Sequence, residues 1–373
     1  MENILLLIAG VAIAAYMGHR IIPKILVISI RKRLFDVPDL RKVHKRPVPR
    51  LGGVTFFPVI VFVICVLTMY RVIVDQLPND TFTPENTTEM LSLIAGLTLL
   101  YIVGIGDDLV GIRYRNKFKI QLLASALFPL AGLYINNFYG LLGIHELTPF
   151  IGIPLTMLLV IFITNAINLI DGIDGLSSSI CIVALSTFGF LFAQDHLWIY
   201  AQTAFICVGV LIPFFIYNVF GNADRGRKIF MGDTGSLTLG FILSFLVIKH
   251  CMYTGDNSYQ TEGAPIIIAF SILLVPCLDV IRVVLGRLRR HQNPFLPDKT
   301  HIHHKFMDMG FSARASLILI QCISIPLIVM NILLTHYQVD INLIFFLDVA
   351  IWTGLNIWFT KTIINKRKQQ ITP

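Results

Sequence analysis

The chain has 373 residues, of which 55% are hydrophobic and only 14% carry a charge. Soluble domains carry nearly twice that charged fraction, so the composition excludes an ordinary water-soluble globular protein. The apolar residues come in blocks of roughly 16 to 23, long enough to cross a hydrocarbon core of about 30 Å as helices. Lipid offers no partner to free backbone groups, so these blocks must be helical. The sequence predicts an all-α integral membrane protein.

The apolar blocks predict eleven transmembrane helices within one polytopic domain over residues 1–373. The first block has no basic segment before it and no small-residue cleavage site after it, so we interpret it as a retained helix. The breaks between blocks hold the Pro, Gly, Asn and charged residues expected of loops. The predicted spans are 3–19, 52–74, 90–106, 119–136, 151–170, 177–193, 199–219, 235–249, 264–286, 314–335 and 341–361.

Lys and Arg gather in the loops of one side only, whereas the opposite loops carry mainly Asp and Glu. By the positive-inside rule the basic side is cytoplasmic, and an odd number of spans then places the N-terminus outside and the C-terminus in the cytoplasm. The net charge of +8 is explained by this topology and by attraction to anionic membrane lipids. We therefore do not expect nucleic-acid binding.

Acidic residues stand at the cytoplasmic ends of three predicted spans. A single Asp at a helix end is usually an ordinary interface residue. Here the acids gather on an otherwise basic side, beside apolar spans, where ionisable groups are costly and usually functional. Asp107 and Asp108 stand at the end of the third span, and Asp171 and Asp174 at the end of the fifth. Asp233 stands at the beginning of the eighth span.

The fifth span ends in a row of oxygen-bearing side chains. Asn165, Asn168 and Asp171 are three residues apart, which places them on one stripe of a helix. Such a row suits Mg²⁺, a hard cation that takes a few carboxylates together with phosphate oxygens and water. The sequence therefore indicates a magnesium site at this helix end.

Cationic and imidazole side chains accompany the acids. These include Lys45, and Lys117 and Lys119 at the start of the fourth span. The simplest explanation of each is the excess of positive charge on the cytoplasmic side. Lys119 lies where the helix dipole disfavours a cation, and a bound phosphate would offset that cost. A loop that contains Arg290 continues into His301, His303 and His304. This spacing is a weak zinc signal, so we interpret the loop as a polar lid over a phosphorylated substrate, with a solvated basic loop as the alternative.

Acids for a metal, cations for phosphates and a membrane position together favour phosphoryl transfer from a nucleotide-activated substrate to a lipid. A secondary transporter is the alternative of a different class, but transporter sites lie near the midplane between internal repeats, and no repeat is visible. A CDP-alcohol phosphatidyltransferase is disfavoured because its Asp-Gly-x-x-Ala-Arg signature is missing from the chain.

Five motifs in order along residues 36–312 resemble those of the polyprenyl-phosphate N-acetylhexosamine-1-phosphate transferases, especially the bacterial undecaprenyl-phosphate N-acetylglucosaminyl-1-phosphate transferases. The segments that carry the resemblance are His44–Gly53, Gly106–Asp108, Asn165–Leu176, Phe230–Ser236 and Pro297–His304.

The resemblance implies a reaction and a setting. N-acetylglucosamine 1-phosphate would pass from UDP-N-acetylglucosamine to undecaprenyl phosphate with release of UMP, as the first membrane step of an O-antigen, common-antigen or teichoic-acid type polysaccharide. It further implies Mg²⁺, with Mn²⁺ as a substitute, a multi-pass position in the bacterial inner membrane, an active site facing the cytoplasm, and a homodimer as one oligomeric option. Another UDP-N-acetylhexosamine or phospho-MurNAc-pentapeptide stays open as the substrate.

The resemblance also assigns roles to residues, and leaves one-step and two-step chemistry open. The active site would be formed by the cytoplasmic loops 20–51, 107–118, 171–176, 220–235 and 287–313. Metal binding falls to Asn168, Asp171 and Asp233, and catalysis to Asp107 and Asp108. Substrate binding falls to Lys45, Lys119, Asp174 near the uracil, Asn218, Arg290, His301, His303 and His304.

Overall fold

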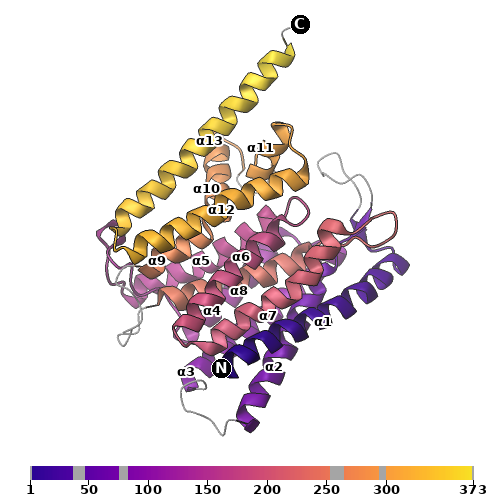
Figure 1. Cartoon of the computed structure of the whole chain (residues 1–373), viewed down its shortest axis with the longest axis vertical. Coiled ribbons are helices and arrows are strands. Elements are labelled where there is room, and N and C mark those ends of the chain that lie inside the picture. Colours follow the sequence, from indigo (N-terminus) through magenta and orange to yellow (C-terminus); the bar gives the residue numbers. More distant parts are fainter. Residues whose placement is uncertain (1, 37–46, 75–82, 253–263, 294–299, 372–373) are drawn as a thin grey trace.

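The computed structural model describes residues 2–36, 47–74, 83–252, 264–293 and 300–371, and it is almost entirely helical (Figure 1). The first eight long helices are α1 (Glu2–Arg31), α2 (Phe56–Val74), α3 (Pro84–Val110), α4 (Tyr114–Leu130), α5 (Pro149–Ile170), α6 (Leu176–Gln194), α7 (Trp198–Phe215) and α8 (Gly232–Cys251). They are followed by α9 (Ala264–Ile272), α10 (Leu274–Arg289), α11 (Ile302–Asp308), α12 (Ala313–His336) and α13 (Ile341–Ile371).

Short elements complete the described chain. The strands β1 (Phe35–Asp36) and β2 (Val48–Pro49) pair antiparallel. Two short helical turns, η1 (Gly52–Thr55) and η2 (Leu141–Gly143), precede α2 and α5, and a π-helical turn, η3 (Ile216–Phe220), ends α7. π-Helical turns often occur at functional sites, and η3 carries Asn218.

The membrane prediction is confirmed in its main point, because nine of the described helices are long and apolar enough to span a bilayer. α9 and α10 make a tenth span if they are counted as one helix bent by 71°. The predicted span 119–136 differs: α4 has 17 residues, about 25 Å of helix against a core of about 30 Å. The described residues therefore give a multi-pass protein without reaching the count of eleven.

Several segments expected to be loops are helical. The region predicted as the loop 20–51 begins inside α1, which runs on to Arg31 past Pro23. α3 continues to Val110, so the Asp107-Asp108 pair lies in its last turn. α13 extends beyond the predicted end at residue 361 and projects from the bundle (Figure 1). Helices exceed their apolar blocks because polar turns outside the hydrocarbon can still continue the backbone hydrogen bonds.

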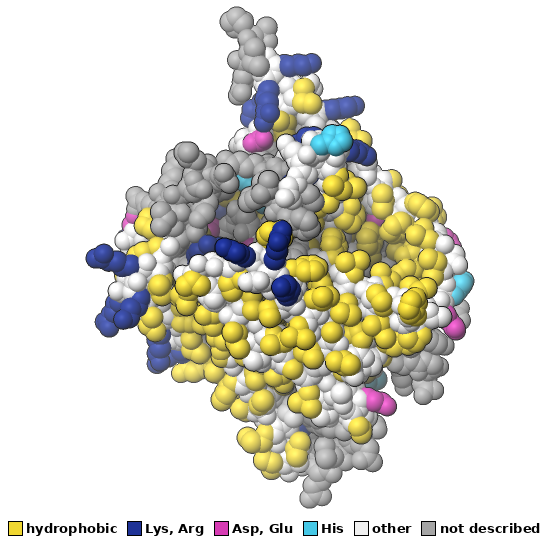
Figure 2. All heavy atoms as spheres, turned by 180° about the vertical axis from the view of Figure 1, so that it is seen from behind, with side chains coloured by type: hydrophobic (Ala, Val, Ile, Leu, Met, Phe, Trp, Pro, Cys, Tyr) yellow, Lys and Arg dark blue, Asp and Glu magenta, His cyan; other side chains and the backbone are white. Residues whose placement is uncertain are grey.

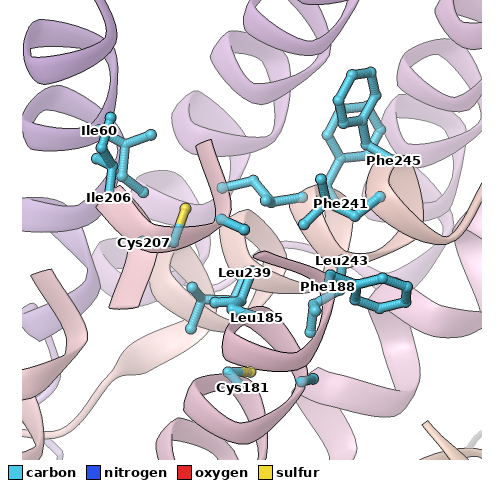
Figure 3. Packing of buried hydrophobic residues seen from close by; sticks show 14 of the residues in the cluster. Ile60, Cys181, Leu185, Phe188, Ile206, Cys207, Leu239, Phe241, Leu243 and Phe245 are labelled. Carbon is cyan, nitrogen blue, oxygen red and sulfur yellow. The ribbon is translucent and has the colours of Figure 1, made fainter. Parts of the chain in front are cut away.

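α8 is the central helix of the bundle, and 94% of its most apolar window is buried. It packs on α3, α5 and α6, and its Phe241 and Leu239 lie in the main core near Leu185 and Phe188 (Figure 3). Close approach to α3 depends on Gly104, since a Cβ there would stand 2.5 Å from the Thr234 Cα. This contact brings the start of α8 against the end of α3.

A second layer of α10 to α13 covers one side of this core (Figure 1). Its smaller apolar cluster joins Ile170 and Leu176 of the main bundle to Ile302, Phe306 and other residues of the outer layer. Figure 2 shows a broad belt of apolar side chains on one face, with Lys and Arg gathered toward its upper and left side. Such a belt is typical of a surface that meets lipid.

Candidate active site

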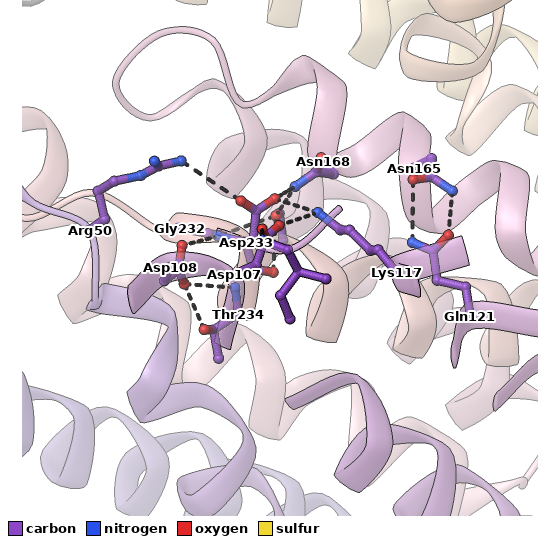
Figure 4. Close-up of polar contacts among 12 residues, drawn as sticks. Arg50, Asp107, Asp108, Lys117, Gln121, Asn165, Asn168, Gly232, Asp233 and Thr234 are labelled. Atoms are coloured by element: carbon purple, nitrogen blue, oxygen red, sulfur yellow. Dashed lines mark hydrogen bonds and ion pairs between the residues drawn. The ribbon is translucent and has the colours of Figure 1, made fainter. Parts of the chain in front are cut away.

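The acidic motifs meet at one end of the bundle, where α3 and α5 end and α8 begins (Figure 4). The Lys117 ammonium, in the first turn of α4, lies 3.0 Å from Asp107 Oδ2 and 2.8 Å from Asp233 Oδ1. The Asn168 amide nitrogen donates to the same Asp233 oxygen at 2.5 Å and to the Ser236 hydroxyl at 2.7 Å. Four helices thus contribute to one compact polar cluster.

Asp108 serves a different purpose from its neighbour Asp107. Its Oδ1 accepts the Asp233 N–H at 2.8 Å, and its Oδ2 accepts the Thr234 N–H at 3.0 Å and the Thr234 hydroxyl at 2.6 Å. A carboxylate that binds the free N–H groups of a helix start both caps that helix and complements its dipole. Asp108 therefore positions the first turn of α8, and with it the side chain of Asp233.

The fit between Asp108 and α8 requires Gly232. This residue has φ of +74°, and a Cβ on it would stand 2.6 Å from Asp108 Oδ2. Glycine alone tolerates such a backbone conformation without strain. The Gly-Asp sequence at the start of α8 is thus a consequence of how closely α3 approaches.

The segment around Arg50 is held against the residues that precede α8 by backbone hydrogen bonds. Phe230 N donates to Pro49 O at 2.7 Å, and Gly52 N donates back to Phe230 O at 2.9 Å. The pairing brings the Arg50 guanidinium to 3.7 Å from Asp233 Oδ2. Arg50 is a cation at the acidic cluster that was not among the predicted site residues.

Asp171 and Asp174 follow α5 on the turn that leads into α6. Burial raises the pKa of Asp171 to about 7, the carboxylates of Asp233 and Asp174 add to the rise, and Arg50 opposes it. Asp174 forms an ion pair with Lys228 from the loop before α8. The turn thus adds negative charge beside Asp233, and Lys228 balances part of it.

Asn218 was expected to contact substrate, but in the structure both ends of its amide bind backbone. Its Oδ1 accepts the Gly175 N–H at 2.6 Å, and its Nδ2 donates to Ile229 O at 2.8 Å. The side chain is buried. Asn218 therefore holds the turn after Asp174 against the segment that leads into α8.

Of the two predicted phosphate lysines, only Lys119 is described, and it is exposed; Lys45 lies outside the described residues. Lys117 faces the acids instead, because residues two apart on a helix point about 200° away from each other. The sequence contained a signal for it, since Lys117 stands in the same basic helix start, but composition could not tell which face turns inward.

The histidine segment packs onto the acidic turn. His303 is 1% exposed, and a Cβ on Gly172 would stand 2.3 Å from its Nε2. Burial, together with the charges that His304 and His301 would carry, lowers the pKa of His303 to about 3, so the ring is neutral at physiological pH. Arg290 is exposed at the end of α10.

His301 is anchored by Asp279, which was not among the predicted site residues. Its Nδ1 lies 2.8 Å from Oδ2 of Asp279, a buried carboxylate on α10. The acid lies inside a predicted membrane span, and that position was the available signal. The rings of His303 and His304 lie close together, with centroids 4.3 Å apart.

Known proteins resemble the chain along most of its length. The glycosyl transferase family 4 model matches residues 90–250, from α3 to α8. A probable undecaprenyl-phosphate N-acetylglucosaminyl 1-phosphate transferase of Bacillus subtilis is 31% identical over 90% of this chain and 88% of the relative. The chain belongs to the polyprenyl-phosphate N-acetylhexosamine-1-phosphate transferase family.

Two further members of the family extend the match. An undecaprenyl-phosphate alpha-N-acetylglucosaminyl 1-phosphate transferase of Yersinia pestis is 30% identical, over 79% of this chain and 74% of its own. A decaprenyl-phosphate N-acetylglucosaminephosphotransferase of Mycolicibacterium smegmatis is 28% identical, over 79% of this chain and 73% of its own. The chain is thus a membrane phospho-glycosyltransferase by family.

The cluster of this family member has a ligand set suited to a hard cation. Within the described part of the chain, no three His, Cys, Asp or Glu side chains are grouped to hold a metal by themselves. Asp107 and Asp233 instead bring two carboxylates to one ammonium group, and the Asn168 amide binds Asp233. Mg²⁺ is commonly held in this way, by one or two carboxylates with water and substrate phosphates. The residues therefore fit a magnesium ion.

Proposed function

We propose that the protein transfers N-acetylglucosamine 1-phosphate from UDP-N-acetylglucosamine to undecaprenyl phosphate, giving undecaprenyl-diphospho-N-acetylglucosamine and UMP. The observation that carries the proposal is the cluster in which Lys117 joins Asp107 to Asp233 and Asn168 binds Asp233. The printed names of the Bacillus subtilis and Yersinia pestis relatives support the lipid and the sugar.

In this reaction an oxygen of the lipid phosphate attacks the β-phosphorus of the nucleotide sugar, and the bond to the UMP oxygen breaks. Phosphoryl transfer is accelerated mainly by positioning and by stabilising charge on the phosphate oxygens. Lys117 and Arg50 are the described cations nearest Asp233 and would bind those oxygens. Asp107, held by Lys117 and by the Ile112 N–H at 2.6 Å, would accept the proton of the lipid phosphate.

We assign the magnesium ion to Asp233 and Asn168, with Asp171 beside them, and expect Mn²⁺ to replace it. Bound there, the cation would neutralise charge on the diphosphate. His303 lies against Gly172 of the acidic turn, with His301 and His304 beside it, and we propose that the three rings cover the nucleotide sugar. Asp174 would contact the nucleotide once Lys228 moves aside.

We place the site at the cytoplasmic face of the bacterial inner membrane. The argument is the excess of Lys and Arg in the loops on that side. A nucleotide sugar made in the cytoplasm then reaches the cluster without crossing the bilayer, and the lipid reaches it from the membrane. The product would begin a cell-surface polysaccharide.

The test offers purified protein, undecaprenyl phosphate and Mg²⁺ a panel of UDP-sugars and follows UMP release. UDP-N-acetylglucosamine should give the fastest release, and a metal chelator should abolish it until Mg²⁺ is returned. Preference for another UDP-N-acetylhexosamine would correct the sugar and leave the reaction class standing. Absence of UMP release from every donor, with flux of a solute in vesicles, would contradict the proposal and favour a transporter.

A further inference from the structure

Asp279 is the buried carboxylate to which the histidine segment is attached. Its side chain is 1% exposed, and it belongs to α10, the second half of the bent apolar pair. The anchoring carboxylate is thus separate from the five acids of the cluster. Burying it costs free energy that its hydrogen bonds must offset.

Three donors converge on this carboxylate. Oδ2 lies 2.8 Å from His301 Nδ1, and Oδ1 accepts the Ile302 N–H at 3.1 Å and an Arg282 N–H at 2.7 Å. The same Arg282 nitrogen donates to Thr300 O at 2.5 Å. The residues that enter α11 are therefore fixed both through backbone groups and through one imidazole ring.

α11 has only seven residues, too few to form a stable helix without support. The Ile302 N–H and the Thr300 carbonyl would already anchor it to Asp279 and Arg282. The contact to His301 Nδ1 is not needed to anchor the helix. Its additional effect is to fix the orientation of the imidazole ring. A ring whose Nδ1 carries its proton toward a carboxylate presents Nε2 on its other side.

His303 lies between the His301 ring and the turn that carries Asp171. The rings of His301 and His303 are nearly parallel, with an interplanar angle of 2° and centroids 5.9 Å apart. His303 in turn lies against Gly172, next to Asp171. The His303 Nδ1 is buried without a hydrogen-bond partner among the described residues, as expected for a group that a bound ligand completes.

We propose that Asp279 is a positioning residue, which orients His301 so that its Nε2 binds a phosphate oxygen of the nucleotide sugar. The proposal rests on the proposed function, because it needs a diphosphate substrate over the acidic turn. A carboxylate behind the ring stabilises the protonated imidazole when an anion binds in front of it. Asp279 then acts through His301 and touches no substrate itself.

A double-mutant cycle tests this relation in the full-length purified protein, with kcat and KM for UDP-N-acetylglucosamine as readouts. Asp279→Asn should lower kcat/KM by about 10- to 100-fold, as loss of a partner that orients a functional histidine commonly does. In a His301→Ala background the same change should cost less than about threefold, because coupled residues are not additive. Equal losses in both backgrounds would overturn the proposal and leave Asp279 with a structural role.

Asp308→Asn is the matched control. It is the same substitution on α11, at an exposed residue paired with Arg367, and its kinetics should match the wild type. If Asp279→Asn does not yield folded protein, Asp279→Glu takes its place. This variant keeps the charge for Arg282 but displaces the oxygen that faces His301, so a several-fold loss of kcat/KM is expected, and unchanged kinetics would overturn the proposal.

A spectroscopic measurement separates this inference from the proposed function. In protein labelled with ¹⁵N-histidine, with the His301 signals assigned through His301→Gln, Nδ1 should carry the proton in the wild type and lose that preference in Asp279→Asn. An unchanged His301 spectrum would overturn the inference even in an active enzyme. Failure of UMP release from all UDP-sugars would instead contradict the proposed function, whatever the spectrum shows.

Discussion

α8 has a polar cluster at each of its ends, and each includes an acid of α3. At its start, Asp233 meets Asp107 through Lys117. At its last turn, Lys249 lies 2.8 Å from Glu89 Oε1 and its ammonium stands 4.8 Å from the ring centre of Tyr200. The Tyr200 hydroxyl donates to the other oxygen of Glu89. The two clusters share helices, burial and lysine–carboxylate pairs.

They differ in charge balance. Glu89 and Lys249 pair one acid with one base, and the Tyr200 hydroxyl donates a hydrogen bond to the second carboxylate oxygen of Glu89. Among the described residues the acidic cluster has more carboxylates than cations: its acids are Asp107, Asp108, Asp171, Asp174 and Asp233, and its cations are Arg50, Lys117 and Lys228. Surplus buried charge is costly unless a ligand offsets it. An excess of carboxylates over cations, rather than burial or ion pairing alone, therefore distinguishes the candidate site.

Asp233→Asn should have the largest effect on activity. Removing this carboxylate takes away the partner of Lys117, Arg50 and Asn168 at once. UMP release should fall by about 10³-fold or more, which corresponds to roughly 4 kcal/mol of transition-state stabilisation. The variant in detergent should elute from a size-exclusion column at the volume of the folded wild type. Near-normal turnover would contradict the assignment of the acidic cluster as the active site.

Lys117→Met and Lys119→Met form a matched pair that sharpens the assignment of the phosphate lysine. The first should reduce kcat by about 100-fold, the size of effect typical of removing one preorganised charge or donor. The second should stay within about threefold, because Lys119 is exposed. A larger loss from Lys119→Met than from Lys117→Met would favour the position that the family resemblance first indicated.

Glu89→Gln tests the opposite end of α8. It leaves Lys249, whose side chain is 10% exposed, without its counter-charge. Breaking a buried pair in this way costs roughly 3–5 kcal/mol of stability. The temperature of half-inactivation should drop, whereas kcat of the surviving folded protein should stay within about twofold. A selective loss of kcat with unchanged heat stability would show that the balanced cluster also takes part in turnover.

Arg367→Ala should have the smallest effect. Its ion pair with Asp308 joins α13 to α11, but the two side chains are 67% and 50% exposed. Exposed pairs contribute little to stability, since water and salt screen them. Neither the heat stability nor the kinetics should change measurably. A clear loss of kcat would indicate that the histidine helix depends on α13 for its position.

The sequence predicted the fold class because its signal is local. Blocks such as 52–74 are apolar along almost their whole length, and a bilayer leaves such a block one conformation, the helix. Hydropathy did not predict the break between α9 and α10, because residues 264–278 hold no charged residue while the backbone bends by 71° within them. Hydropathy does not report a bend that neighbouring helices impose.

Asp107 and Asp108 show the same limit within the site. As neighbours they are about 100° apart on a helix, so they could not serve one purpose equally. The choice between them depends on where α8 begins and on how closely Gly104 lets α3 approach it. Such details belong to helix packing and are absent from any local pattern.

The sequence by itself determined a helical membrane protein with acids at helix ends, and its motifs identified the family. These properties follow from composition and from residue order. The tertiary structure alone decided that Lys117 rather than Lys119 faces the acids, that Asn218 binds backbone, and that Asp279 holds His301. These outcomes depend on distances between helices far apart in the chain, which side-chain packing sets and local sequence does not encode.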